Sequence, residues 1–151
     1  MYSCEGDLLV KGAKGSTLSN AQAYRYSVLM FLHRTVLERL YRDEIVQGHV
    51  HTLLLYCNVV VASGGPVSAL LWPLFVAACE AQTAVDRGLA RRVFLAIKSR
   101  QGMANIEKAR AVVMEVWRRA DSGACDAPTS CDSVDLWRTI AGETGLNLVL
   151  G

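Results

Sequence analysis

The chain has 151 residues, of which 52% are apolar and 20% are charged, and 16 basic against 14 acidic side chains leave a formal net charge of +2. This composition is too apolar for a disordered chain, too poor in cysteine for a disulfide scaffold, and far from the glycine and proline content of a fibrous repeat. A charge of +2 gives no general attraction to nucleic acid or anionic lipid. We therefore expect one folded domain, or part of one.

The amino terminus and the cysteines indicate an intracellular protein. Residues 1–10 include Glu5 and Asp7 and lack the basic opening and apolar run of a secretory signal. An odd number of cysteines without a Cys-x-x-Cys pair is typical of reduced thiols, which argues against zinc and disulfide frameworks. The five cysteines are Cys4, Cys57, Cys79, Cys125 and Cys131.

The first predicted helix runs from Ala21 to about Arg42. Residues 1–20 are rich in glycine, serine and lysine and show no periodicity, so we expect a poorly ordered lead-in. In the helix, a charged ridge of Arg34, Glu38 and Arg42 is expected to face water. Apolar positions at helical spacing predict the opposite, core-facing side. These positions are Val28, Leu29, Leu32, Val36 and Leu40.

The middle of the chain carries no Asp, Glu, Lys or Arg between Glu44 and Glu80, which raises the question of a membrane span. Its halves, Ile45–Ser63 and Val67–Ala81, are separated by Gly64, Gly65 and Pro66, and the second contains Pro73. Neither half supplies the ~20 uninterrupted apolar residues that a span needs, and the break would leave backbone groups unpaired in lipid. The pattern predicts a buried, kinked helical hairpin.

Three further helices complete the predicted fold. Thr83 and Asp86 are spaced as a cap for a helix that ends near Gly102, and Asn105 is predicted to cap the next helix. A loop over residues 121–131 precedes a short helix from about Asp132 to Thr144, with Gly145 as its left-handed final residue. We predict an all-α, irregular bundle of about six helices.

A search for reactive groups assigns no catalytic, cofactor-binding or metal-binding residue. The segment Gly12–Thr17 resembles a phosphate loop only superficially, because its lysine precedes the last glycine. His49 and His51 would point about 200° apart on a helix and could not chelate one metal. Nothing brings His33 to a cysteine, and Cys57 and Cys79 are expected in the core.

Charged side chains receive structural interpretations as well. Glu80 ends an apolar helix and therefore needs water or a cation, with Arg87 or another nearby arginine as its expected partner. A basic excess on the fourth and fifth helices could bind phosphate, but it lacks interleaved aromatic residues, which favours a solvated face. This excess comprises Arg87, Arg91, Arg92, Lys98, Arg100, Lys108, Arg110, Arg118 and Arg119.

The segment Leu70–Ala81 reads Leu-Leu-Trp-Pro-Leu-Phe-Val-Ala-Ala-Cys-Glu-Ala and is followed by Asp86-Arg87. Together with Tyr24-Arg25 and Leu32-His33-Arg34 upstream, and Val116-Trp117 and Asp135-Leu136-Trp137-Arg138 downstream, it resembles the fungal-specific transcription factor domain. That domain is the regulatory region of transcription factors with a binuclear zinc cluster. The resemblance covers about Ala21 to Gly151, and Ala78 departs from it because relatives often have glycine there.

The resemblance implies a nuclear, non-enzymatic regulator of transcription that acts through protein interaction or effector sensing. It implies the carboxyl-terminal part of a larger regulatory domain, with protein partners or further helices to cover it. Six suitably spaced cysteines are not in this chain, so zinc and direct DNA contact are not carried over, and DNA would be reached only through a zinc-cluster domain. The signature residues, each expected to be structural, are Trp72, Pro73, Phe75, Glu80, Arg87, Trp117 and Trp137.

Two alternatives stay open at this point. One is a small helical membrane-associated protein built on the uncharged segment 45–79. The other is a helical enzyme with a cysteine or histidine in a cleft. Carbonate extraction would test the first and selective thiol labelling the second.

Overall fold

The computed structural model describes residues 3–40, 42–101, 104–123 and 136–148. Within these residues it contains six α-helices, one short 3-10 helix and no strand. This confirms the predicted all-α, irregular bundle. The elements are α1 (Ser3–Thr35), α2 (Glu44–Ala62), η1 (Ser68–Leu70), α3 (Leu71–Glu80), α4 (Ala84–Gln101), α5 (Ala104–Ser122) and α6 (Leu136–Glu143).

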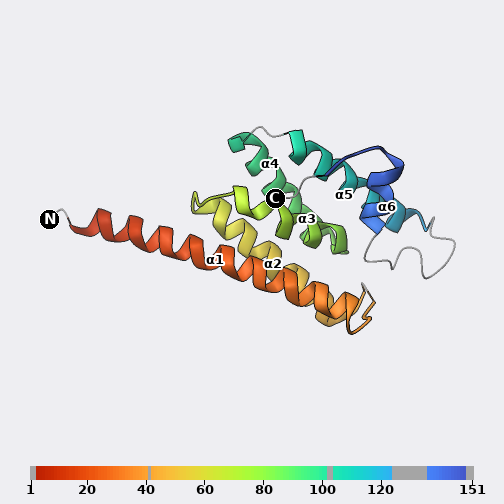
Figure 1. Ribbon diagram of the computed structural model, residues 1–151. Coiled ribbons are helices and arrows are strands. Elements are labelled where there is room, and N and C mark those ends of the chain that lie inside the picture. The colour runs from red at the N-terminus through yellow and green to blue at the C-terminus, as the bar shows by residue number, and fades with distance from the viewer. Residues whose placement is uncertain (1–2, 41, 102–103, 124–135, 149–151) are drawn as a thin grey trace.

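The helices surround α3, the most apolar of them. Helix α1 runs along α2, and α2 also packs against α3 and α4, while α5 bridges α3, α4 and α6 (Figure 1). Most of α3 is buried, including Phe75 and Leu74, which are fully inaccessible. Burial of apolar side chains against a central helix supplies the main driving force for this arrangement.

Helix α1 differs from its prediction in both its limits and its buried face. It begins at Ser3 instead of Ala21 and ends at Thr35 instead of Arg42. Val28 and Leu32, predicted to face the core, are exposed, whereas Arg34, predicted to face water, is buried. The buried side is a row of mostly small residues spaced three and four apart, which lets the backbones approach closely. This row is Ser16, Ser19, Ala23, Ser27, Met30 and Arg34.

Residues 16–20, which were assigned to the lead-in, contact the bundle. Ser16 and Ser19 are buried, and the Asn20 amide donates to the carbonyl of Pro66 at 3.3 Å. Gly65 lies directly against Ser16, since a Cβ atom on Gly65 would be 1.6 Å from Ser16 Oγ and 2.8 Å from its Cβ. The helical start at Ser3 corrects the predicted beginning of the helix, and the division of the chain at residue 20 stays a prediction.

Gly65→Ala should therefore lower the free energy of unfolding by about 1–3 kcal/mol, the usual cost of overpacking. The cost should fall sharply in a Ser16→Gly background, because both atoms that the new methyl group would strike are then gone. Urea denaturation of the four proteins of this cycle measures the coupling. Equal costs of Gly65→Ala in both backgrounds would contradict the close packing of residue 16 on the bundle.

The central hairpin forms as predicted, with α2 over Glu44–Ala62 and the second arm over Ser68–Glu80. Asp43 caps α2 by accepting from the Ile45 amide at 2.8 Å. Gly64 follows α2 with a φ of +70°, a conformation that favours glycine. Pro73 lies in the first turn of α3, just after the 3-10 turn, where a missing amide costs least. The change from 3-10 to α-helix falls at Leu71, two residues before Pro73.

The remaining helices follow the sequence pattern closely. Thr83 Oγ1 accepts from the Asp86 amide at 3.1 Å, as the predicted cap requires. Helix α5 starts at Ala104, so Asn105 lies inside its first turn instead of capping it. Gly145 has a φ of +66° and ends α6, as predicted. Gly102, most of the loop over residues 121–131, and the predicted start at Asp132 lie outside the described residues.

By length and composition, α2 is the single helix among the described residues that could cross a membrane. One face of α2 is packed against other helices of the chain, which is also typical of a core helix. The buried residues of α2 are Val46, Val50, Leu53, Leu54, Cys57 and Val60.

Candidate functional site

A cavity of about 130 Å³ lies at the junction of α1, α3 and α6. Three aromatic side chains, Phe31, Trp72 and Trp137, come from the three helices in turn. Apolar and sulfur-containing side chains and three charged groups complete the lining. The remaining lining residues are Met30, Arg34, Val76, Cys79, Glu80 and Arg138. Two of the signature tryptophans and the signature glutamate thus meet at one place.

The buried ion pair of Arg34 and Glu80 forms one wall of the cavity. Arg34 Nε lies 3.1 Å from Glu80 Oε2 and 3.3 Å from Oε1, and the two side chains are only 4% and 11% exposed. Arg34 Nη1 also donates to the carbonyl of Arg39 at 2.6 Å. Charges this far from water need such partners, so the pair fixes the end of α1 against the end of α3.

The partner of Glu80 was therefore mispredicted. Arg87 instead donates through Nη1 to both carboxylate oxygens of Asp121, at 2.9 and 2.7 Å, and through Nε to the carbonyl of Ala81. The prediction that Glu80 forms a structural ion pair is confirmed, but its partner is Arg34. Arg34 lies 46 positions away from Glu80 in the sequence. It was not predicted as the partner because it had been assigned to the water-facing ridge of the first helix.

Both tryptophans of the cavity are held by further aromatic contacts. Trp72 stacks on Tyr24 with ring centroids 6.0 Å apart, and the Tyr24 hydroxyl donates to the carbonyl of Ala69 at 2.7 Å. Trp137 meets Phe75 edge to face at 5.2 Å, a favoured aromatic geometry. The Arg138 guanidinium lies 5.1 Å above the Trp137 ring. Trp72 is thus held by a residue of α1, and Trp137 by a residue of α3 and one of its own helix.

The remaining signature residues support α3 from its other side. Trp117 on α5 is 4% exposed, and its indole Nε1 donates to the carbonyl of Ala78 at 2.7 Å. The guanidinium groups of Arg87 and Arg91 each lie 5.2 Å from the Trp117 ring centroid. Some of the signature residues therefore line the cavity, and others join α3 to α4 and α5.

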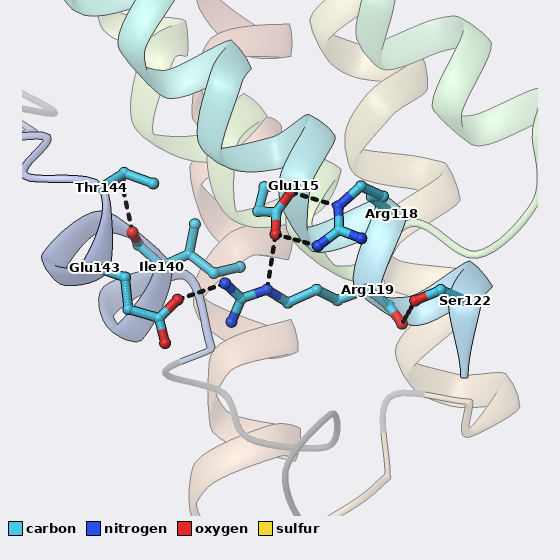
Figure 2. Close-up of polar contacts among 7 residues, drawn as sticks. All are labelled: Glu115, Arg118, Arg119, Ser122, Ile140, Glu143 and Thr144. Atoms are coloured by element: carbon cyan, nitrogen blue, oxygen red, sulfur yellow. Dashed lines mark hydrogen bonds and ion pairs between the residues drawn. The ribbon is translucent and has the colours of Figure 1, made fainter. Parts of the chain in front are cut away.

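A polar cluster fastens α6, and with it Trp137, to α5 (Figure 2). Arg119 Nε donates to Glu115 Oε1 at 2.9 Å, and Arg119 Nη2 contacts the Glu143 carboxylate. Arg118 binds the two oxygens of Glu115 at 2.7 Å each. Hydrogen bonds from Arg118 first and then Arg119 lower the pKa of Glu115 to about 2. The Glu115 carboxylate consequently stays ionised at physiological pH.

Several basic side chains of α4 and α5 contact other groups of the chain. Lys98 contacts Glu107, and Arg100 Nη2 donates to the carbonyl of Val61 at 2.6 Å. Residues 12–17 are helical, so they form no phosphate loop. Among the described residues there is no group of three or more His, Cys, Asp or Glu side chains that could hold a metal ion.

The three histidines separate into a pair and a single residue. His33 on α1 and His49 on α2 face each other with ring centroids 5.1 Å apart. Burial, and secondarily the charge of His33, lowers the pKa of His49 below its ordinary value of 6.5. His51 instead lies 2.6 Å from an oxygen of the buried Asp86. His49 and His51 thus point to different neighbours, as their spacing predicted.

The lowered pKa of His49 predicts a loss of stability in acid. The unfolded chain binds a proton at His49 near pH 6.5, whereas the folded chain binds it only at lower pH. The stability that neutral His49 contributes is therefore fully present above pH 6.5 and is lost as the pH falls through the pKa of the folded state. Urea midpoints measured between about pH 7.5 and about pH 5 should show this decline, and His49→Gln should reduce it. An unaltered decline in His49→Gln would refute the assignment.

The described residues thus form an all-helical fold with an aromatic-lined cavity at the junction of α1, α3 and α6. The chain belongs to the family described as the fungal specific transcription factor domain, which matches residues 3–151. No curated protein and no solved structure matches the chain. The match confirms the resemblance and begins upstream of Ala21. Membership supports a role in regulating transcription, and the family is in general non-enzymatic and nuclear.

Sequence analysis missed part of the cavity lining. Met30 and Phe31 received no assignment, and Arg34 was placed in water, although Arg34 and Arg138 both stand in the motifs that carry the family resemblance. The presence of Arg34 in a family motif was the available signal.

Proposed function

We propose that this chain is a regulatory domain of transcription control that works in the nucleus through protein interaction or effector sensing and has no catalytic activity of its own. The observation that carries the proposal is the family match over residues 3–151. DNA would be reached through a zinc-cluster domain outside this chain. The aromatic-lined cavity supports effector sensing.

Exposed apolar side chains support the protein-interaction part of the proposal. On α1, Val28 and Leu32 are 58% and 43% exposed, and on α2, Leu55 and Val59 are 45% and 50% exposed. Neighbouring exposed apolar residues on packed helices are typical of surfaces that bind other proteins. Protein partners, or further helices of a longer regulatory domain, would cover them.

A reporter assay tests the proposal. The full chain is fused to an unrelated sequence-specific DNA-binding domain in fungal cells that carry a reporter gene with the matching DNA site. We expect the fusion to raise or lower the reporter relative to the DNA-binding domain alone. Phe75→Ala in the fusion should abolish the effect, and Val85→Ala, at a 66% exposed position, should not. An unchanged reporter at equal fusion levels would overturn the proposal.

The extent of the domain is a separate proposal. We infer that residues 21–151 are the carboxyl-terminal part of a larger family domain and that residues 1–20 lead into it. The genomic sequence upstream of the codon for Met1 tests this inference. Coding sequence for further helices and a six-cysteine cluster would support it, and an unrelated upstream gene would contradict it.

The membrane-associated alternative is favoured by one observation, the length and apolar composition of α2. A chain anchored by α2 would stay in the membrane pellet after carbonate extraction. Release into the supernatant, together with recovery of the untagged chain in the nuclear fraction, is the result that our proposal predicts. Burial of one α2 face against the neighbouring helices supports that outcome.

The enzyme alternative places a reactive cysteine or histidine in a cleft. In its cysteine form it requires a reactive thiol, and the environment of both described thiols opposes one. Burial raises the pKa of Cys57 to about 12 and raises the pKa of Cys79 above its ordinary value. With Cys4, Cys125 and Cys131 replaced by serine, labelling of Cys57 at neutral pH should be slow and limited by opening of the fold. Rapid labelling of the folded protein would revive the enzyme hypothesis.

A further inference from the structure

The cavity between α1, α3 and α6 has the size of one aromatic ring. Its volume is about 130 Å³, and an apolar cavity of about 150 Å³ can stay dry and bind benzene. Phe31, Trp72 and Trp137 offer aromatic contacts to a ligand, and Met30 and Val76 offer aliphatic ones. An aromatic ligand gains more from these walls than an aliphatic one, because paired rings attract each other beyond the effect of the area that they bury.

The charged side chains of the lining already have partners within the chain. Arg34 and Glu80 form the buried ion pair, with Arg34 Nε 3.1 Å from Glu80 Oε2. The Arg138 guanidinium lies 5.1 Å from the Trp137 ring centroid, at an exposed position of α6 where water and salt screen its charge. A charged ligand would lose its hydration in the cavity and would have to displace one of these contacts to gain a counter-charge. The lining therefore favours a ligand without charge.

The cavity reaches the surface between α1 and α6. Phe31 on α1 is 43% exposed and Arg138 on α6 is exposed as well, whereas Val76 on α3 is only 9% exposed. Among the described residues, α1 and α6 make few direct contacts with each other. A ligand would therefore enter between α1 and α6 and rest on α3.

We propose that this cavity binds a small uncharged aromatic molecule of about one ring, in contact with Phe31, Trp72 and Trp137. The inference rests on the proposed regulatory function and supplies the ligand class for its effector-sensing part. Such a ligand would contact α1, α3 and α6 together. Its binding would consequently stabilise the position of α6 on the bundle.

The test is a titration of the ¹⁵N-labelled full chain with benzyl alcohol, followed by NMR. We expect the indole N–H signals of Trp72 and Trp137 to shift in a saturable manner, and that of Trp117, which does not line the cavity, to stay in place. Benzoate and benzylamine carry the same ring with a negative and a positive charge at neutral pH. Both should bind at least about tenfold more weakly, because burial of a charge without a partner is unfavourable.

A matched pair of variants on α1 locates the binding. Phe31 and Leu32 are neighbours and are each 43% exposed, but only Phe31 lines the cavity. Phe31→Ala should weaken the binding of benzyl alcohol about three- to tenfold through the lost ring contact, whereas Leu32→Ala should leave it unchanged. Val76→Phe should fill the cavity and abolish the shifts, with its urea midpoint used to verify folding. Should Val76→Phe fail to fold, the pair on α1 decides the matter alone.

Four results would overturn the inference. They are no saturable shift of Trp72 and Trp137, a charged analogue that binds as tightly as benzyl alcohol, equal effects of Phe31→Ala and Leu32→Ala, or unchanged binding in a folded Val76→Phe variant. The reporter assay keeps such a failure separate from that of the proposed function. A fusion that alters transcription while its chain ignores benzyl alcohol refutes the ligand class only. A silent fusion refutes the regulatory role.

Discussion

Glu80→Ala is expected to lower the free energy of unfolding by about 3–5 kcal/mol, because it leaves the Arg34 guanidinium buried without its counter-charge. Arg34 is only 4% exposed at its side chain, so bulk solvent compensates poorly for the lost carboxylate. Urea denaturation monitored by circular dichroism measures the change.

Two companion variants show whether the loss belongs to the buried pair. Arg34→Met combined with Glu80→Leu should recover most of the stability, because a buried ion pair replaced by apolar side chains of similar size is often neutral. Arg118→Met removes one partner of an exposed pair and should cost at most about 1 kcal/mol. If Glu80→Ala proved as mild as Arg118→Met, the buried pair would not hold the end of α1.

Phe75→Ala should cost about 3–5 kcal/mol, the usual loss for deleting a buried aromatic side chain. Phe75 is fully inaccessible on the central helix and supports Trp137 of α6 through an edge-to-face contact. The variant should therefore also alter the fluorescence of Trp137. Urea denaturation and tryptophan emission in a Trp72→Phe, Trp117→Phe background measure the two effects.

Leu95→Ala provides the matched control on an exposed surface. Leu95 lies on α4 and is 55% exposed, so its truncation should change stability by no more than about 0.5 kcal/mol. A small loss in Phe75→Ala would mean that α3 does not form the centre of the core. An unchanged Trp137 emission would show that Phe75 does not support α6.

Helix α1 shows where sequence reasoning reaches its limit. Its apolar residues lie on more than one side, and periodicity alone selected the stripe that contains Val28 and Leu32. The bundle instead buries the small residues Ser16, Ser19 and Ala23, because they allow α1 to lie close to its neighbours. Hydrophobicity ranks serine below leucine, so a pattern of hydrophobicity cannot foresee a contact that depends on small size.

Only part of the candidate site could be predicted from the sequence. The Trp-Pro segment and the later tryptophans identified the family, and Trp72, Glu80 and Trp137 do line one cavity. The pairing of Glu80 with Arg34 instead of Arg87 joins residues 46 positions apart. Such a pairing depends on how α1 and α3 pack against each other, which the spacing of residues within one helix cannot reveal.

What the sequence determined by itself is the all-helical class and the central helical hairpin, because helical periodicity and the Gly64-Gly65-Pro66 break are local properties of the backbone. The sequence also determined the family, through residues that are distinctive in themselves. The tertiary structure alone decided which side of α1 is buried, which arginine neutralises Glu80, and that three helices enclose a cavity. These features arise from packing between distant segments, where shape and burial outweigh the preference of any single side chain.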